Sequence, residues 1–125
     1  MKDALYQAGL AVRRRILGEA WVEKSLKGRT PFTADFQDMI TRNVWGEIWT
    51  RPGLDPSTRR LLVLAVTAAL GRWEEFRLHL SAGLDGGLEW SDIEEVLLQT
   101  ALYAGVPAAN TGFDLAVKER ERRQG

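Results

Sequence analysis

The longest uninterrupted apolar stretch lies in the middle of the chain, from Leu61 to Leu70, and it carries no charge and one hydroxyl. A helix that is apolar on all sides is typically buried, and this stretch is too short to cross a bilayer. We therefore expect a core helix here. Arg72, Glu75 and His79 follow at spacings of three and four, which makes them neighbours on one face of a helix.

Periodicity and capping signals predict further helices on both sides of this segment. Thr33 is a candidate N-cap for the second helix, Asp55-Pro56 opens the central one, and Ser91 with Glu94 has the spacing of a capping box. Whether the central helix stops at Gly71 or continues is left open by the pattern. The expected helices cover residues 3–17, 33–44, 56–70 with its continuation to 83, 91–104 and 108–123.

No segment alternates with period two for long enough to be a strand. The sequence therefore predicts an all-α fold of about six helices, in one domain over residues 1–125. The run of three arginines at 13–15 is most simply a solvated or subunit-facing helical surface, with a site for an anionic ligand as the alternative.

Composition excludes several classes of function. Lys and Arg (17) balance Asp and Glu (17), so no bulk charge favours nucleic acid. The chain has no cysteine and one histidine, which argues against disulfides, a thiol nucleophile and a zinc site of the usual ligands. The N-terminus lacks the apolar run of a signal peptide, so we expect a cytoplasmic protein with no membrane span. Five tryptophans favour a homo-oligomer, because aromatic residues are enriched at interfaces.

His79 and Glu75 allow two interpretations. The pair can be a structural i,i+4 contact worth roughly 0.2–0.5 kcal/mol. Alternatively His79 is the chemical centre of the protein, since imidazole titrates near neutral pH, and Glu75 orients it. A carboxylate so close should favour the charged imidazolium.

Three segments carry a resemblance to a known family. WGEIWTRPGL (Trp45–Leu54), ALGRWEEFRLHLSAGLDGGL (Ala69–Leu88) and EVLLQTALYAGVPAAN (Glu95–Asn110) closely resemble the carboxymuconolactone decarboxylase family. The resemblance implies a helical-hairpin core with the fold of alkylhydroperoxidase D-like proteins, and a ring-like homohexamer. It also implies an enzyme without cofactor or metal. Its closest branch decarboxylates 4-carboxymuconolactone to 3-oxoadipate enol-lactone in the protocatechuate branch of aromatic catabolism.

The implied substrate is an unsaturated lactone dicarboxylate, in which the lactone carbonyl can accept the electron pair left by carbon dioxide. Arginine suits the two carboxylates, because its planar fork binds them bidentately. The candidates are Arg59 first, because the family pattern also has arginine there, then Arg72, Arg51 and Arg42. For each of the four, a structural ion pair is the alternative.

Aromatic and amide side chains complete the candidate site. Tyr103 and Asn110 are candidate donors to an oxyanion, with a packing tyrosine and a helix-capping asparagine as the alternatives. Trp45, with Trp49, either walls the pocket or fills a subunit interface. His79 itself is expected to stabilise the enolate or to return the proton to carbon.

Two positions depart from the family. Trp21 stands where the decarboxylase branch usually has histidine, and Asn43 where it often has histidine or tyrosine. These departures leave open an enzyme for a different lactone, or a non-catalytic oligomeric helical module of the same fold. The redox chemistry of the alkylhydroperoxidase D-like relatives is excluded, because it needs a Cys-x-x-Cys pair.

Overall fold

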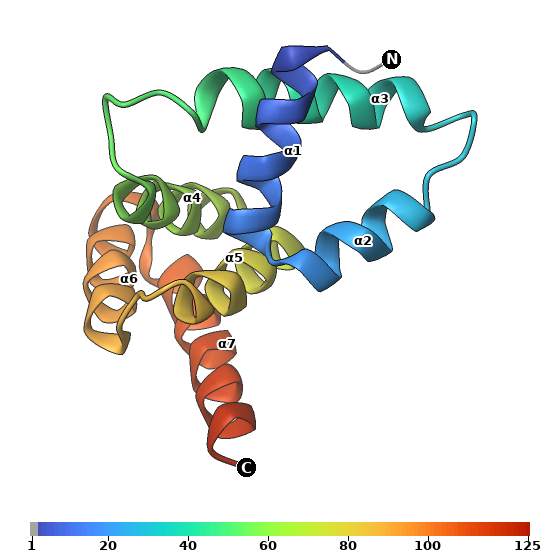
Figure 1. Ribbon diagram of the computed structural model, residues 1–125. Helices are drawn as coiled ribbons and strands as arrows, with labels where there is room; N and C mark the ends of the chain where they lie inside the picture. The colour runs from blue at the N-terminus through green and yellow to red at the C-terminus, as the bar shows by residue number, and fades with distance from the viewer. Residues whose placement is uncertain (1–2) are drawn as a thin grey trace. The chain divides into compact units, whose positions relative to one another are not determined.

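The computed structural model describes residues 3–125, and these residues form α-helices and one π-helical segment with no strand (Figure 1). The all-α prediction is confirmed, with seven α-helices and one π-helix where about six helices were expected. The chain divides into two compact units, one up to Pro56 and one from Ser57 to Gly125. That the whole chain is one domain stays a prediction.

The first unit begins with a capped helix. The Asp3 carboxylate accepts the backbone N–H of Tyr6 at 2.8 Å, which satisfies one of the free donors at the helix start. The segment at 19–27, which the sequence pattern left unassigned, is also helical. The elements of this unit are α1 (Ala4–Leu17), α2 (Glu19–Lys27), α3 (Ala34–Met39) and the π-helix η1 (Ile40–Ile48).

Helix α1 crosses η1 with the two backbones in close approach. A Cβ atom on Gly9 would lie 1.9 Å from the carbonyl oxygen of Thr41, and one on Gly46 would lie 2.5 Å from the carbonyl oxygen of Leu5. At both positions a side chain would clash with the backbone of the other helix, so only glycine fits. This crossing holds the first unit together.

The predicted second helix is longer and more irregular than its pattern indicated. It starts after Thr33 as expected and changes at Ile40 into η1, where the hydrogen bond from Trp49 N–H to the Val44 carbonyl (3.0 Å) spans five residues. Such π-helical turns occur often at functional sites. Along η1 the Trp45 and Trp49 rings stack with centroids 5.1 Å apart.

Arg13 corrects the interpretation of the arginine run as a solvated surface, because its side chain is buried. Its guanidinium donates to Thr41 Oγ1 at 3.3 Å, Gln37 Oε1 at 3.3 Å and Ser25 Oγ at 3.4 Å. It also lies 5.5 Å from the ring centroid of Trp21, a cation–π distance. Arg13 is thus part of the packing of the first unit.

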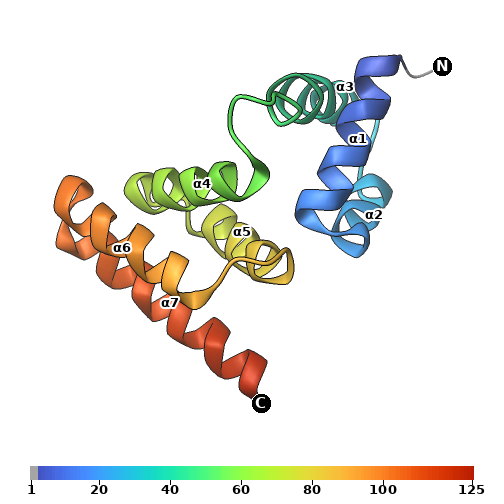
Figure 2. The same cartoon turned by 60° about the vertical axis from the view of Figure 1, so that its left-hand side comes forward.

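The second unit answers the question left open at Gly71. Gly71 has a φ of +71° and separates two helices, so the central helix ends there in a conformation that favours glycine. Figure 2 shows the last two helices running side by side. The elements of the second unit are α4 (Pro56–Leu70), α5 (Trp73–Asp85), α6 (Trp90–Ala104) and α7 (Val106–Gln124).

All four of these helices contribute buried residues to one core, among them α4 and α5, the two helices that are joined at Gly71. The fully buried members include Leu64, Phe76, Leu80, Ile93 and Leu97. This confirms the helical-hairpin core that the resemblance implied.

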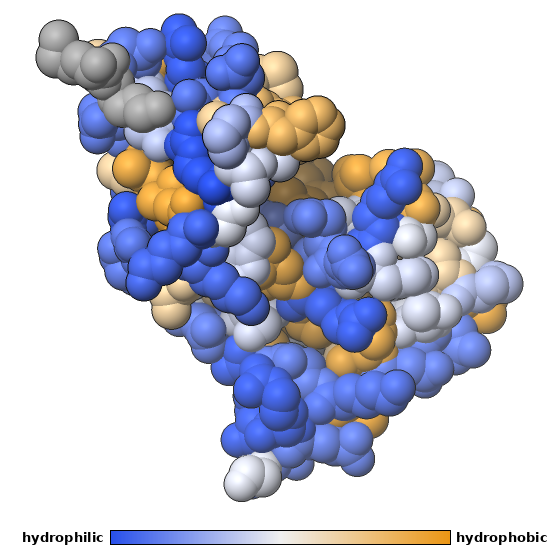
Figure 3. All heavy atoms as spheres, turned by 90° about the vertical axis from the view of Figure 1, so that its right-hand side faces the viewer, coloured by the Kyte–Doolittle hydropathy of each residue, from blue (hydrophilic) through white to orange (hydrophobic). Residues whose placement is uncertain are grey.

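Helix α4 is not buried on all sides, contrary to the expectation from its composition. Leu62, Val66 and Leu70 are exposed, and they occupy the face opposite the buried stripe of Leu64 and Ala68. Apolar side chains also reach the surface in separate patches on the face of the molecule drawn in Figure 3.

The capping box of α6 lies two residues earlier than predicted. The Glu89 N–H donates to Asp92 Oδ2 at 2.9 Å and the Glu89 side chain accepts from the backbone there, so Glu89 is the N-cap rather than Ser91. Both pairs have the same three-residue spacing. Trp90 is the first residue of the helix, so the residue before it, Glu89, occupies the N-cap position.

The charged C-terminal end of α7 contacts α5 through an ion pair and hydrogen bonds. Arg123 Nη1 lies 3.0 Å from Asp85 Oδ1, and Arg123 Nη2 donates to the carbonyl oxygen of Ser81 at 2.9 Å. Glu119 contacts Arg123 Nε at 2.7 Å. Among the described residues, no helix is long and apolar enough to cross a membrane.

Candidate active site

Helix α5 places His79 inside the second unit and Glu75 at its surface. His79 belongs to the buried stripe of α5 with Phe76, Leu80 and Gly83, and it is 6% exposed. Glu75 lies one turn earlier with a side chain that is 62% exposed, and its Oε2 is 3.9 Å from His79 Nε2. The sequence therefore predicted the pairing, but not the burial of the imidazole.

A buried arginine that the sequence interpretation missed accompanies His79. Arg60 is 5% exposed and shares the inward stripe of α4 with Leu64 and Ala68. A Cβ atom on Gly86 would lie 2.5 Å from Arg60 Nη2, so the guanidinium rests against the C-terminal end of α5. The start of α4 therefore meets the end of α5, and the two helices run antiparallel.

The environment of His79 disfavours the imidazolium. Burial, and after it the positive charge of Arg60, lower the pKa of His79 from 6.5 to about 4. This contradicts the expectation that Glu75 would favour the charged form. Glu75 is largely in water, where its attraction over 3.9 Å is screened.

At neutral pH the site thus contains an uncharged imidazole within the influence of the buried positive charge of Arg60. A neutral imidazole has one N–H donor and one acceptor nitrogen. It can donate a hydrogen bond to a developing oxyanion without being an acid. Burial also lowers the pKa of Arg60, and the charge of Asp85 opposes that effect.

The other arginines of the second unit differ in position. Arg59 is half-buried in the first turn of α4. Arg72 is exposed at the start of α5, and it lines a shallow pocket of about 260 Å³ together with Glu75. The structure therefore brings Arg72 and Glu75 together. It also adds the buried Arg60, whereas the sequence interpretation had chosen the adjacent Arg59.

Tyr103 and Asn110 are both exposed. Tyr103, 82% exposed, lines an apolar groove of about 380 Å³ with Val66 and Ala69 of α4, and His79 is not among the residues lining it. Asn110 lies in the second turn of α7, whose N-cap is Gly105. The helix-capping alternative for Asn110 is therefore wrong.

The remaining candidates belong to the first unit. Trp45 is buried against Trp49, whereas Arg51 and Asn43 are exposed. Arg42 Nη2 lies 3.1 Å from Asp3 Oδ2, so the ion-pair alternative holds for Arg42.

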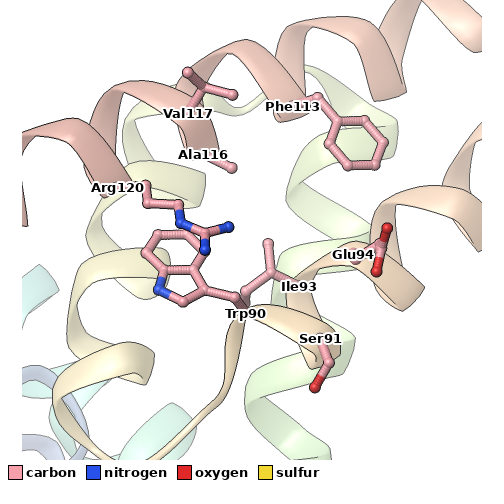
Figure 4. A pocket seen from close by; sticks show the side chains of 8 residues that line it. All are labelled: Trp90, Ser91, Ile93, Glu94, Phe113, Ala116, Val117 and Arg120. Carbon is pink, nitrogen blue, oxygen red and sulfur yellow. The ribbon is translucent and has the colours of Figure 1, made fainter.

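A further pocket, of about 290 Å³, lies between α6 and α7 and contains none of the predicted residues. Figure 4 shows the Arg120 guanidinium over the Trp90 indole, at 5.4 Å from the ring centroid, with Phe113 across the cavity. Over residues 3–125, no three His, Cys, Asp or Glu side chains form a group that could hold a metal ion.

These features define a class: an all-helical, cysteine-free protein with a buried histidine and arginine on an antiparallel helical hairpin. The model of the carboxymuconolactone decarboxylase family matches residues 34–118. This match spans more than half of the chain. The protein belongs to the carboxymuconolactone decarboxylase family.

Its curated relatives include two kinds of decarboxylase. The chain is 45% identical to 4-carboxymuconolactone decarboxylase of Acinetobacter baylyi over 111 residues, which cover 89% of this chain and 83% of the relative. It is 38% identical to nitrosuccinic acid decarboxylase npaB of Metarhizium robertsii over 104 residues, 83% of this chain and 73% of the relative. A 4-carboxymuconolactone decarboxylase of Pseudomonas putida is 45% identical over 42 residues, 34% of this chain and 88% of the relative.

Proposed function

We propose that the protein is a carboxy-lyase that decarboxylates 4-carboxymuconolactone, or a close lactone analogue, to the enol-lactone. The observation that carries this proposal is the 45% identity to 4-carboxymuconolactone decarboxylase over 89% of the chain. The buried pair of His79 and Arg60 supports it, because the reaction needs a polar group that faces developing negative charge.

The reaction places three demands on the protein. The bond between the ring carbon and its carboxylate breaks, and the electron pair passes through the ring double bond to the lactone carbonyl oxygen. A proton then adds to the carbon beside that carbonyl. The protein must hold two carboxylates, stabilise the enolate oxygen and supply that proton.

We assign a role to each of the predicted residues. His79 donates its N–H to the enolate oxygen, and Glu75 orients the imidazole from the surface side. Arg59, at the start of α4, is assigned to a carboxylate, and Arg72, beside Glu75 at the other end of α5, is the alternative. Arg51, Trp45, Tyr103 and Asn110 are assigned to the substrate-binding surface on the family resemblance.

A second substrate class is favoured by the relative that is 38% identical and acts on nitrosuccinic acid. In that molecule a carboxylate sits on the carbon that bears the nitro group, which can accept the electron pair as the lactone carbonyl does. Both substrates are dicarboxylates that contain their own electron sink. Trp21 and Asn43 stand where the family often has other residues. For this reason both substrates should be tested.

We further propose a cytoplasmic homo-oligomer, with six subunits as the family resemblance implies. The exposed apolar side chains of α4 and α6, including Leu70 and Leu102, support self-association. The reaction needs no cofactor because the substrate supplies the electron sink. The rival is a non-catalytic helical module that has kept the fold.

The test is a set of steady-state kinetic measurements on both substrates with matched variants. His79→Gln should lower kcat on the order of 10²–10³, as removal of one oxyanion donor does, with KM nearly unchanged. Arg59→Ala should act mainly on KM, because a carboxylate contact binds ground and transition state alike. Glu75→Gln should fall between them.

Arg77→Gln is the control, because Arg77 is exposed on the same helix. A folded and assembled His79→Gln enzyme within threefold of the parent would show that His79 is structural. A parent protein inactive on both substrates would favour the non-catalytic module.

A further inference from the structure

The cavity of about 290 Å³ between α6 and α7 has a largely apolar lining. The rings of Trp90 and Phe113 are half-buried at its walls, and the buried part of its lining includes Ile93. The small side chain of Ala116 leaves the space open, because Phe113 and Arg120 occupy the same face of α7 one turn before and one turn after it. The cavity therefore has the size and character of a site for a small molecule with one ring.

Arg120 is held at this cavity by an aromatic ring rather than by a carboxylate. Its guanidinium lies 5.4 Å from the ring centroid of Trp90, which is a cation–π contact. Arg122 and Arg123, on the same helix, both pair with Glu119. Within residues 3–125, the guanidinium of Arg120 makes no ion pair and donates no hydrogen bond. Stacking uses the face of a guanidinium, so its N–H groups, which lie in the plane, are available to an anion.

A second charge lies on the other side of the cavity. Figure 4 shows Arg120 and Glu94 on opposite sides, with Ile93 between them. The side chain of Glu94 is exposed, and it forms no ion pair or hydrogen bond in the part of the chain that the structure describes. The cavity is thus complementary to a molecule with an anion at one end, a hydrogen-bond donor at the other, and an apolar body between them.

We propose that this cavity binds a small aromatic acid that carries a hydroxyl group opposite its carboxylate. The carboxylate accepts hydrogen bonds from Arg120, the ring lies between Trp90 and Phe113, and the hydroxyl donates to Glu94. His79 is not among the residues that line the cavity, so this is a second site, separate from the candidate active site. The proposal goes beyond the proposed function, and a binding experiment tests it without any measurement of decarboxylation.

The experiment is isothermal titration calorimetry of the parent protein with three probes: 4-hydroxybenzoate, benzoate and phenol. 4-Hydroxybenzoate should bind with a Kd on the order of 1 mM or tighter, as a ligand of this size can. Benzoate lacks the hydroxyl and should bind more weakly. Phenol lacks the carboxylate and should bind most weakly, because the contact with Arg120 is the charge-assisted one.

Four single substitutions at exposed positions assign the binding to this cavity. Arg120→Gln should raise the Kd for 4-hydroxybenzoate about tenfold, because hydrogen bonds from a charged group are lost. Glu94→Gln should raise the Kd for 4-hydroxybenzoate but not that for benzoate, which has no hydroxyl to donate. Lys118→Gln and Glu95→Gln are the matched controls, since they remove charges from the same two helices and do not line the cavity. Both controls should bind as the parent does.

The indole N–H signal of Trp90 shows directly whether a probe occupies the cavity. In an NMR titration of the parent, this signal, identified by its absence in Trp90→Phe, should shift on saturation with 4-hydroxybenzoate. Binding that leaves the signal unmoved, or that is equally tight in the parent and in Arg120→Gln, would place the probe elsewhere and overturn the proposal. The absence of any binding at a concentration about tenfold above the expected Kd would overturn it as well.

Discussion

Acid should destabilise this protein through His79. In the folded chain the pKa of His79 is lowered to about 4, while in the unfolded chain it has its ordinary value of 6.5. Between these values the unfolded state binds the extra proton, so the free energy of unfolding falls as the pH is lowered. The stability is fully present above pH 6.5 and is lost as the pH falls toward 4.

The size of the effect follows from these two values. On moving from pH 7.5 to pH 5, the imidazole should take about 2 kcal/mol from the free energy of unfolding. His79 is 6% exposed, so little of the shift is lost to screening. His79→Gln lacks the titrating group and should lose less stability over the same range.

The assay is urea unfolding of the parent and of His79→Gln at both pH values, at one subunit concentration. Other groups add their own pH dependence. Burial raises the pKa of Glu119, and the hydrogen bonds and charges of Arg122 and Arg123 together outweigh burial and lower it. These other groups are common to both proteins, so the difference between the two losses isolates His79. Equal losses in the two proteins would refute the burial of an uncharged imidazole.

Further outcomes can be checked without substrate or with simple assays. Gly9→Ala should lower the free energy of unfolding by about 1–3 kcal/mol, because its Cβ would meet the Thr41 carbonyl at 1.9 Å; a thermal melt unchanged from the parent would contradict this. Leu64→Ala, at a fully buried site, should cost about 2–5 kcal/mol in urea unfolding. Dialysis against a chelator should leave activity unchanged, and loss restored by a metal would refute cofactor independence. Light scattering should give a mass well above the 14.0 kDa of one chain, and a monomer would end the oligomer proposal.

Helix ends could be predicted where one local signal acts alone. The helix expected from residue 3 begins at Ala4 after its cap Asp3, and α4 begins at Pro56 as predicted. At the start of α6 the pairs Glu89/Asp92 and Ser91/Glu94 have the same three-residue spacing, and the local pattern does not separate them. The sequence also left open whether the helix ends at Gly71, because a glycine within a helix costs only about 1 kcal/mol.

Burial depends on packing between helices, which the local pattern does not contain. The all-apolar run in α4 predicted a core helix, yet only the stripe through Leu64 and Ala68 is buried, and Val66 faces outward. The same limit applies to His79, because its spacing from Glu75 predicts a shared helical face but not the burial of the imidazole. The burial of His79 depends on how α4 packs against α5. The protonation state of the imidazole depends in turn on that burial.

The sequence contains a signal that distinguishes the buried Arg60 from the adjacent Arg59. Consecutive residues on a helix point about 100° apart, so only one of two adjacent arginines can share the stripe of Leu64 and Ala68. The spacing of four from Leu64 identifies Arg60 as that residue. A charge in such a stripe is costly unless something offsets it, and the structure supplies Asp85 and the space over Gly86. For an arginine, register with an apolar stripe therefore indicates a buried charge better than a position before a core helix does.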